Sequence, residues 1–255
     1  MNTVHHRLPL EDRVAIVTGA TGGLGRHIVR GLGDAGATCV IHYAHRAEEA
    51  SVLEEELRTK GLRAMSFRAD VADEPEVQRM VSGVIDAFGR VDILINNAGI
   101  SRDGLSWKLE ASVWSEVLAT NLTGSFHTIK AVLPHMRGAE WGRIVNISSI
   151  VSQAGVPGTA AYAASKAGLA GLTRVVAREV AAKQITVNCL ALGYFNTGLI
   201  ETLTPEARQA VTGQIPVRQL GEPDAVVQAI RYLCSDGAAY LTGQVIHLNG
   251  GLFLG

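Results

Sequence analysis

Tyr162 and Lys166 lie four residues apart, and Ser149 precedes them at the end of an apolar run. The segment around the pair is rich in Ala, Leu, Lys and Arg, which favours a helix, and residues i and i+4 share one helical face. A neighbouring ammonium is expected to lower the pKa of a phenol from about 10, because positive charge favours the phenolate. The tyrosine could then exchange protons nearer neutral pH while the serine hydroxyl holds a carbonyl oxygen. Carbonyl reduction needs such a group.

A glycine-rich segment near the N-terminus strengthens this interpretation, since a Tyr and a Lys at this spacing are more often an ordinary aromatic and a solvated charge. Residues 13–18 form a β-branched apolar run typical of a buried strand. Gly19, Gly23 and Gly25 follow, and residues 26–32 then have helical apolar spacing. Glycines let the backbone approach a pyrophosphate, and a helix N-terminus offers unpaired N–H groups. We therefore predict a dinucleotide site here; the alternative is an ordinary tight turn.

Strand-like and helix-like segments alternate along the whole chain. This alternation predicts an α/β fold with a doubly wound parallel sheet of the Rossmann type and helices on both faces. The least regular stretch, residues 192–219, follows a strand's carboxyl end, where ligands bind in such folds. The predicted strands are 13–18, 38–43, 63–69, 91–96, 143–148, 185–190 and 244–248, and the predicted helices include 47–60, 74–88, 112–136, 160–182 and 224–234.

The composition is that of an ordinary globular protein. The chain has 255 residues, 47% hydrophobic and 18% charged, with a formal net charge of -1. We expect a single domain over residues 1–255, with residues 1–10 as a flexible tail. The charge gives no reason to expect nucleic acid or an anionic membrane as a partner, and no apolar stretch approaches the roughly 20 residues of a membrane span.

The N-terminus and the cysteines indicate a cytoplasmic protein. The N-terminus has neither the apolar core nor the cleavage site of a signal peptide. Cys39, Cys189 and Cys234 are scattered in apolar settings, as expected for buried free thiols in a reducing compartment. The histidines lack ligand spacing, so no metal site is predicted.

Several motifs in a fixed order resemble the short-chain dehydrogenase/reductase family over nearly the whole chain, from about residue 10 to residue 255. Some segments are most similar to 3-oxoacyl-acyl-carrier-protein reductases and to related acetoacetyl-CoA reductases; these segments are 103–105, 121–124, 132–136, 220–223 and 247–251. The family motifs are residues 18–25, Asp70, residues 96–99, Asn121, Ser149, Tyr162 with Lys166, and residues 249–251.

The resemblance implies a role for each of four catalytic residues. Tyr162 would donate a proton to the carbonyl oxygen, Ser149 would polarise that oxygen, and Lys166 would lower the phenol pKa and hold the ribose hydroxyls. Asn121 would support a water chain that resupplies protons. The residues themselves leave alternatives open, because Ser149 could merely cap a turn and Asn121 could be a satisfied polar group in a helix kink.

The resemblance implies a nicotinamide cofactor, and the end of the second strand favours NADP(H). Residues 39–46 contain no acid to hold a ribose 2′-hydroxyl, whereas Arg46, beside His45, could meet a 2′-phosphate. Gly22 stands where many NADP-dependent relatives carry a basic residue, so we expect a moderate preference. The cofactor-binding residues implied are Gly19, Thr21, Gly22, Gly23, Leu24, Gly25, His45, Arg46, Asp70, Val71, Asn97, Ala98, Gly99, Tyr162, Lys166, Phe195 and Thr197.

The expected function is NADPH-dependent reduction of a 3-oxoacyl thioester, carried by acyl-carrier protein or coenzyme A, in a homotetramer. Leu192 stands where the family often has proline, and Gly198 replaces an acid common in the carrier-protein reductases. Both departures affect the loop after the sixth strand. A small-molecule carbonyl reductase therefore remains an alternative, as does a non-catalytic dinucleotide sensor, which would have no need of the proton donor.

Overall fold

The computed structural model describes residues 8–254 and contains one seven-stranded parallel sheet. The strand order is β3-β2-β1-β4-β5-β6-β7, so the chain moves outward from β1 first to one edge and then to the other. This arrangement confirms the predicted doubly wound parallel sheet. The strands are β1 (Val14–Val17), β2 (Thr38–Tyr43), β3 (Ala64–Arg68), β4 (Ile93–Asn96), β5 (Gly142–Ser149), β6 (Ile185–Leu192) and β7 (Val245–Leu248).

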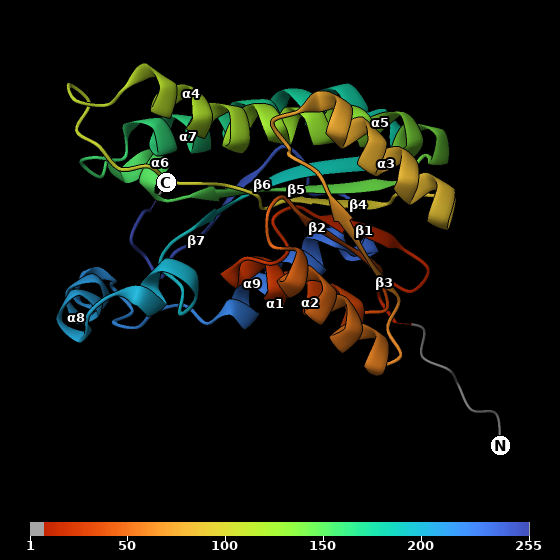
Figure 1. The fold of residues 1–255 in the computed structure, drawn as a ribbon, viewed down its shortest axis with the longest axis horizontal. Coiled ribbons are helices and arrows are strands. Elements are labelled where there is room, and N and C mark those ends of the chain that lie inside the picture. The colour runs from red at the N-terminus through yellow and green to blue at the C-terminus, as the bar shows by residue number, and fades with distance from the viewer. Residues whose placement is uncertain (1–7, 255) are drawn as a thin grey trace.

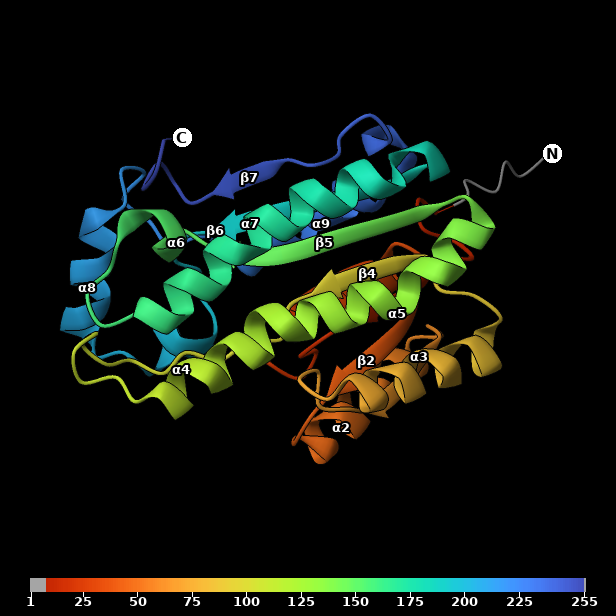
Figure 2. The ribbon, with the colours of Figure 1, turned by 90° about the horizontal axis from the view of Figure 1, so that it is seen from above.

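Helices cover both faces of the sheet (Figures 1 and 2). One face packs against α1 (Gly23–Asp34), α2 (Ala47–Thr59) and α9 (Pro223–Cys234). The opposite face packs mainly against α3 (Glu74–Phe88), α5 (Gly124–Ala139) and α7 (Ala160–Val180).

The two hydrophobic cores follow from the period of a strand. Along β1, Ala15 and Val17 lie in one core while Val14 and Ile16 lie in the other, because successive side chains point to opposite faces. All four are at most 4% exposed, which explains why the sequence shows a continuous apolar run instead of alternation.

The predicted long helix over residues 112–136 is interrupted. The structure has α4 (Ala111–Leu118), a five-residue π-helical segment (Ala119–Thr123) and then α5. Apolar periodicity does not reveal one wide turn inside a continuous helix, so the interruption was not predicted.

The irregular stretch after β6 contains a helix whose bounds we did not predict. A 3-10 turn (Gly198–Thr202) precedes α8 (Pro205–Gln214). The start of α8 had a recognisable signal, because Thr204 Oγ1 accepts a hydrogen bond from Ala207 N and Pro205 occupies the first turn. No residue of α8 is buried, so its apolar pattern was weak.

The described part of the chain includes residues 8–10 of the segment expected to be a tail. Leu10 is only 1% exposed, and its N–H donates to the Ala35 carbonyl. Leu10 therefore packs in the core beside the end of α1. Residues 1–7 of the expected tail lie outside the described residues.

Candidate active site

A cleft of about 900 Å³ runs along the carboxyl ends of β1, β2, β3 and β4. Its walls come from the turn after β1, the end of β2, the segment after β3 and the segment after β4. Thirteen of the seventeen residues expected to bind the cofactor line this cleft: Gly19, Thr21, Gly22, Gly23, Leu24, Gly25, His45, Arg46, Asp70, Val71, Asn97, Ala98 and Gly99.

The glycine turn leaves no room for side chains. Gly19 has φ +61°, and a Cβ placed on it would lie 2.9 Å from Ala98 Cα. A Cβ on Gly23 would lie 2.8 Å from the backbone nitrogen of Gly198, and one on Gly25 would collide with the Gly19 carbonyl. The turn is therefore a bare backbone cradle at the N-terminus of α1, which fits a pyrophosphate group.

The catalytic candidates meet beside this cleft, next to Gly99 on its wall. Lys166 is buried on α7, and its Nζ donates a 2.7 Å hydrogen bond to the Ile147 carbonyl on β5. A Cβ placed on Gly99 would lie 3.4 Å from that Nζ, so the lysine reaches the wall of the cleft. Lys166 Nζ is 5.7 Å from the centre of the Tyr162 ring, and Ser149 lies close enough to the Tyr162 phenol to affect its pKa. The fold thus brings Ser149, Tyr162 and Lys166 together.

The predicted lowering of the phenol pKa was wrong. Burial raises the pKa of Tyr162, and the nearby Ser149 side chain offsets only part of that rise. Burial also lowers the pKa of Lys166 to about 8, because an ammonium loses its hydration shell inside the protein. The sequence showed that the two groups are neighbours but not that both are desolvated. The phenol consequently keeps its proton at neutral pH.

Asn121 lies in the π-helical segment and is completely buried. Its Oδ1 accepts from Ile100 N at 2.8 Å, while its Nδ2 donates to the Ile100 carbonyl at 2.9 Å and to Ser165 Oγ at 3.0 Å. Ser165 Oγ in turn donates to the Tyr162 carbonyl. The Asn121 side chain therefore joins the segment after β4 to α7, the helix that carries Tyr162 and Lys166.

Two further arginines line the cleft and were missed by the sequence analysis. Arg26 lies one helical turn after Gly22, and its Nε is 3.4 Å from the Gly22 carbonyl. Arg102 follows β4 and pairs with Glu116 at 3.2 Å. Residues i and i+4 are neighbours on a helix surface. The spacing of Gly22 and Arg26 could therefore have indicated that the Arg26 guanidinium lies near Gly22, which has no side chain of its own.

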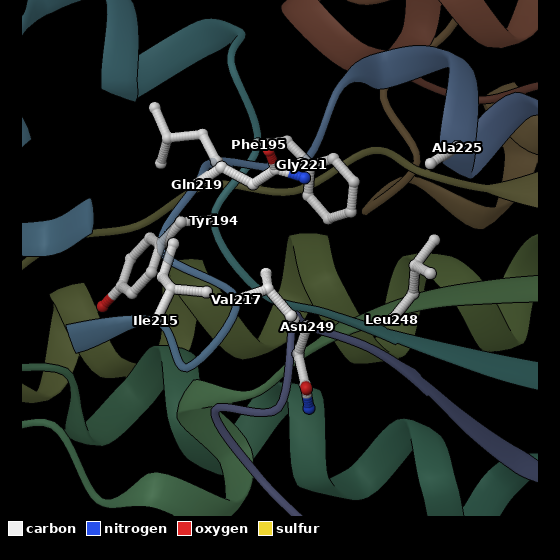
Figure 3. A pocket seen from close by; sticks show the side chains of 11 residues that line it. Tyr194, Phe195, Ile215, Val217, Gln219, Gly221, Ala225, Leu248 and Asn249 are labelled. Carbon is white, nitrogen blue, oxygen red and sulfur yellow. The ribbon is translucent and has the colours of Figure 1, made fainter. Parts of the chain in front are cut away.

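Phe195 and Thr197 are separated by the fold. Thr197 Oγ1 would be 2.8 Å from a Cβ on Gly23, so it contacts the glycine turn. The Phe195 ring instead lines a separate cavity of about 90 Å³ with Tyr194, Ile215 and Leu248 (Figure 3). Neither residue is among those that line the large cleft.

Metal and membrane features are not found in the described part of the chain. Within residues 8–254, no group of three His, Cys, Asp or Glu side chains could hold a metal ion. No helix in that range is long and apolar enough to cross a membrane. Cys39, Cys189 and Cys234 are buried and free, and burial raises the pKa of Cys39 to about 12.

Comparison with known proteins gives matches over nearly the whole chain. The family model for short chain dehydrogenases matches residues 13–208. A 3-oxoacyl-acyl-carrier-protein reductase of Staphylococcus aureus is 40% identical over 240 residues, covering 94% of this chain and 98% of the relative. The enzymes of the same name from Pseudomonas aeruginosa and Vibrio cholerae are each 40% identical, over 97% and 96% of this chain and 100% and 99% of their own length.

Proposed function

Because the chain belongs to the short-chain dehydrogenase family, we propose that it reduces a 3-oxoacyl thioester to the 3-hydroxyacyl thioester with NADPH. The acyl group would be carried by an acyl-carrier protein or coenzyme A, in the cytoplasm. The observation that carries the proposal is the meeting of Ser149, Tyr162 and Lys166 beside the glycine-lined cleft. The names of the three relatives support the choice of substrate.

Each catalytic side chain has one task in this reaction. NADPH supplies the hydride when it is bound. The Ser149 hydroxyl donates a hydrogen bond to the substrate carbonyl oxygen and stabilises the charge that develops there. The protonated Tyr162 phenol gives its proton to the same oxygen, and the buried Lys166 ammonium stabilises the phenolate that remains.

The proposed preference for NADPH depends on charge at the end of β2. Arg46 and His45 line the cleft there, and residues 39–46 contain no carboxylate to repel a phosphate. A guanidinium and a phosphate form charge-assisted hydrogen bonds that are often bidentate. Arg26 adds a second cation on the same cleft.

Steady-state rates test this function. Acetoacetyl-CoA, an acetoacetyl carrier protein and a panel of simple ketones would each be measured with NADPH and with NADH. We expect the highest kcat/KM for a thioester with NADPH. A higher kcat/KM for a simple ketone would instead support the small-molecule carbonyl reductase, and tight dinucleotide binding without turnover would support a sensor.

A further inference from the structure

His42, in β2, contacts both the glycine turn and the segment after β3. Its side chain is only 2% exposed. Nδ1 is 3.1 Å from Gly19 N, and Nε2 is 2.9 Å from the Ala69 carbonyl. A carbonyl can only accept and an N–H can only donate, so Nε2 must carry the proton and Nδ1 must be the acceptor. The contacts therefore require one tautomer of a neutral imidazole.

The first two N–H groups of the glycine turn both donate to this one residue. Gly19 N–H donates to the His42 ring, and Ala20 N–H donates to the His42 main-chain carbonyl at 2.9 Å. The Gly19 carbonyl accepts from Gly22 N at 3.2 Å and from Asn97 Nδ2 at 3.1 Å. Hydrogen bonds thus hold both the N–H and the carbonyl group of Gly19, which has a left-handed backbone conformation with φ +61°.

This arrangement decides which N–H groups a ligand can use. The N–H groups of Gly19 and Ala20 point to β2, so the free donors of the turn lie further along, at the first turn of α1. The same ring also holds Ala69, which directly precedes Asp70 and Val71 on another wall of the cleft.

We propose that His42 is a positioning residue of the dinucleotide site: its neutral imidazole holds the Gly19 peptide so that the glycine turn keeps the shape that receives the pyrophosphate. The identity of the ligand rests on the proposed function. His42 itself is assigned no contact with the reacting atoms.

The charge state of the ring agrees with this role. Burial lowers the pKa of His42 to about 4, while the Ala69 carbonyl and the negative charge of Asp70, in the segment after β3, act in the opposite direction. The imidazole is therefore neutral near pH 7. As the pH falls toward 4, the ring gains a proton on Nδ1. Two N–H donors, Nδ1–H and Gly19 N–H, then face each other, and the hydrogen bond between them is lost.

Two amide variants, each of which reproduces one ring nitrogen, separate the two hydrogen bonds. His42→Asn keeps an acceptor near the position of Nδ1, for Gly19, and cannot reach Ala69. His42→Gln keeps a donor near the position of Nε2, for Ala69, and leaves the Gly19 N–H unpaired. The measurement is the Kd of NADP+ by calorimetry, without substrate, together with the Tm of each variant. We expect His42→Gln to weaken NADP+ binding about tenfold and His42→Asn to stay within about threefold of wild type, at similar losses in Tm.

The pH dependence of the same Kd gives an independent readout. Wild-type NADP+ binding should weaken as the pH is lowered from 6.5 toward 4, and His42→Asn, which cannot gain this proton, should weaken less. The inference would be overturned if the two variants had equal Kd values for NADP+. It would also be overturned if the Kd of wild type and of His42→Asn changed equally with pH. Either result would show that His42 supports the fold without positioning the dinucleotide site. A wild-type protein that binds no dinucleotide would overturn the proposed function as well, whereas equal variants on a binding wild type overturn only this inference.

Discussion

Burial decides the chemistry of single residues in this site. The Tyr162 phenol has a raised pKa and remains protonated at neutral pH, which is the form that can donate to a carbonyl oxygen. The Lys166 ammonium has a pKa lowered to about 8, so its charge is present at neutral pH and is lost in the mildly alkaline range. Donor and cation therefore coexist near pH 7.

Replacing Tyr162 by Phe removes only the proton donor. We expect kcat to fall by ~10²–10⁴-fold, the usual contribution of general acid catalysis, with little change in the Kd of NADPH. Tyr232→Phe, on an exposed side chain of α9, is the matched control. A Tyr162→Phe variant within threefold of the wild-type kcat would refute the assignment.

Lys166→Ala should reduce the rate and weaken cofactor binding together, because the proposed role of Lys166 includes both the phenol and the ribose hydroxyls. The two measurements are kcat and the Kd of NADPH. Lys183→Ala, which removes a surface ion pair with Glu140, controls for the loss of a lysine elsewhere. An unchanged Kd of NADPH in Lys166→Ala would contradict the double role.

The lowered pKa of Lys166 also predicts a pH profile for reduction. The amine is charged below its pKa of about 8 and neutral above it, so kcat/KM should decline above about pH 8. A slowed but active Lys166→Arg variant keeps its charge at higher pH, and its decline should move to more alkaline values. The same midpoint in both proteins would assign the decline to another group.

Arg46 is expected to determine the preference for the 2′-phosphate. Arg46→Ala should reduce the ratio of kcat/KM with NADPH to that with NADH, because a charge-assisted contact is lost with one cofactor only. Arg58→Ala, at the other end of α2, removes an exposed arginine outside the cleft and should leave the ratio unchanged. A wild-type ratio at or below one would refute the NADPH preference itself.

At the scale of elements, α1 and the loop after β6 approach each other so closely at Gly23 that the glycine turn has no room for a side chain there. A Gly23→Ala methyl group would lie 2.8 Å from both Gly198 N and Thr197 Oγ1, so the loop must shift. We expect the Kd of NADPH to weaken at least about tenfold through this displacement. In α5, Gly138→Ala meets no atom within 4 Å and should raise stability by roughly 0.5–1 kcal/mol without affecting the Kd. Equal Kd values for the two variants would contradict this account of the cradle.

The sequence pattern predicted one continuous helix where the structure has α4 and α5 with a π-helical segment between them. This interruption determines where Asn121 lies. The wide turn at Ala119–Thr123 directs the Asn121 side chain to Ile100 and Ser165. Because π-helical turns are frequent at functional sites, this interruption agrees with a role in positioning α7.

For the whole molecule we predict a homotetramer, and the outer helices support it. Phe126 on α5 and Val175 on α7 are 46% and 57% exposed, so apolar side chains remain on the helix faces that point away from the sheet. A second copy of the chain could bury them. Light scattering at micromolar concentration should give four times the monomer mass of 27.0 kDa, and a monomer would refute the prediction.

The sequence by itself determined the fold class and most of the cleft. All seven strands were predicted within two residues of their observed ends, because continuous apolar runs between glycine turns leave few alternatives to a buried parallel sheet. The motifs that resemble the short-chain dehydrogenase/reductase family also implied thirteen residues that line one cleft, since parallel strands end at the same edge.

Only the tertiary structure decided the states of the buried groups. The pKa values of Tyr162 and Lys166 depend on desolvation, which depends on what other segments cover them. His42 looked like one more strand residue until β2 was placed between the glycine turn and Ala69. The physical reason is the same in each case: local sequence sets backbone conformation, whereas charge and tautomer depend on neighbours that are distant in the chain.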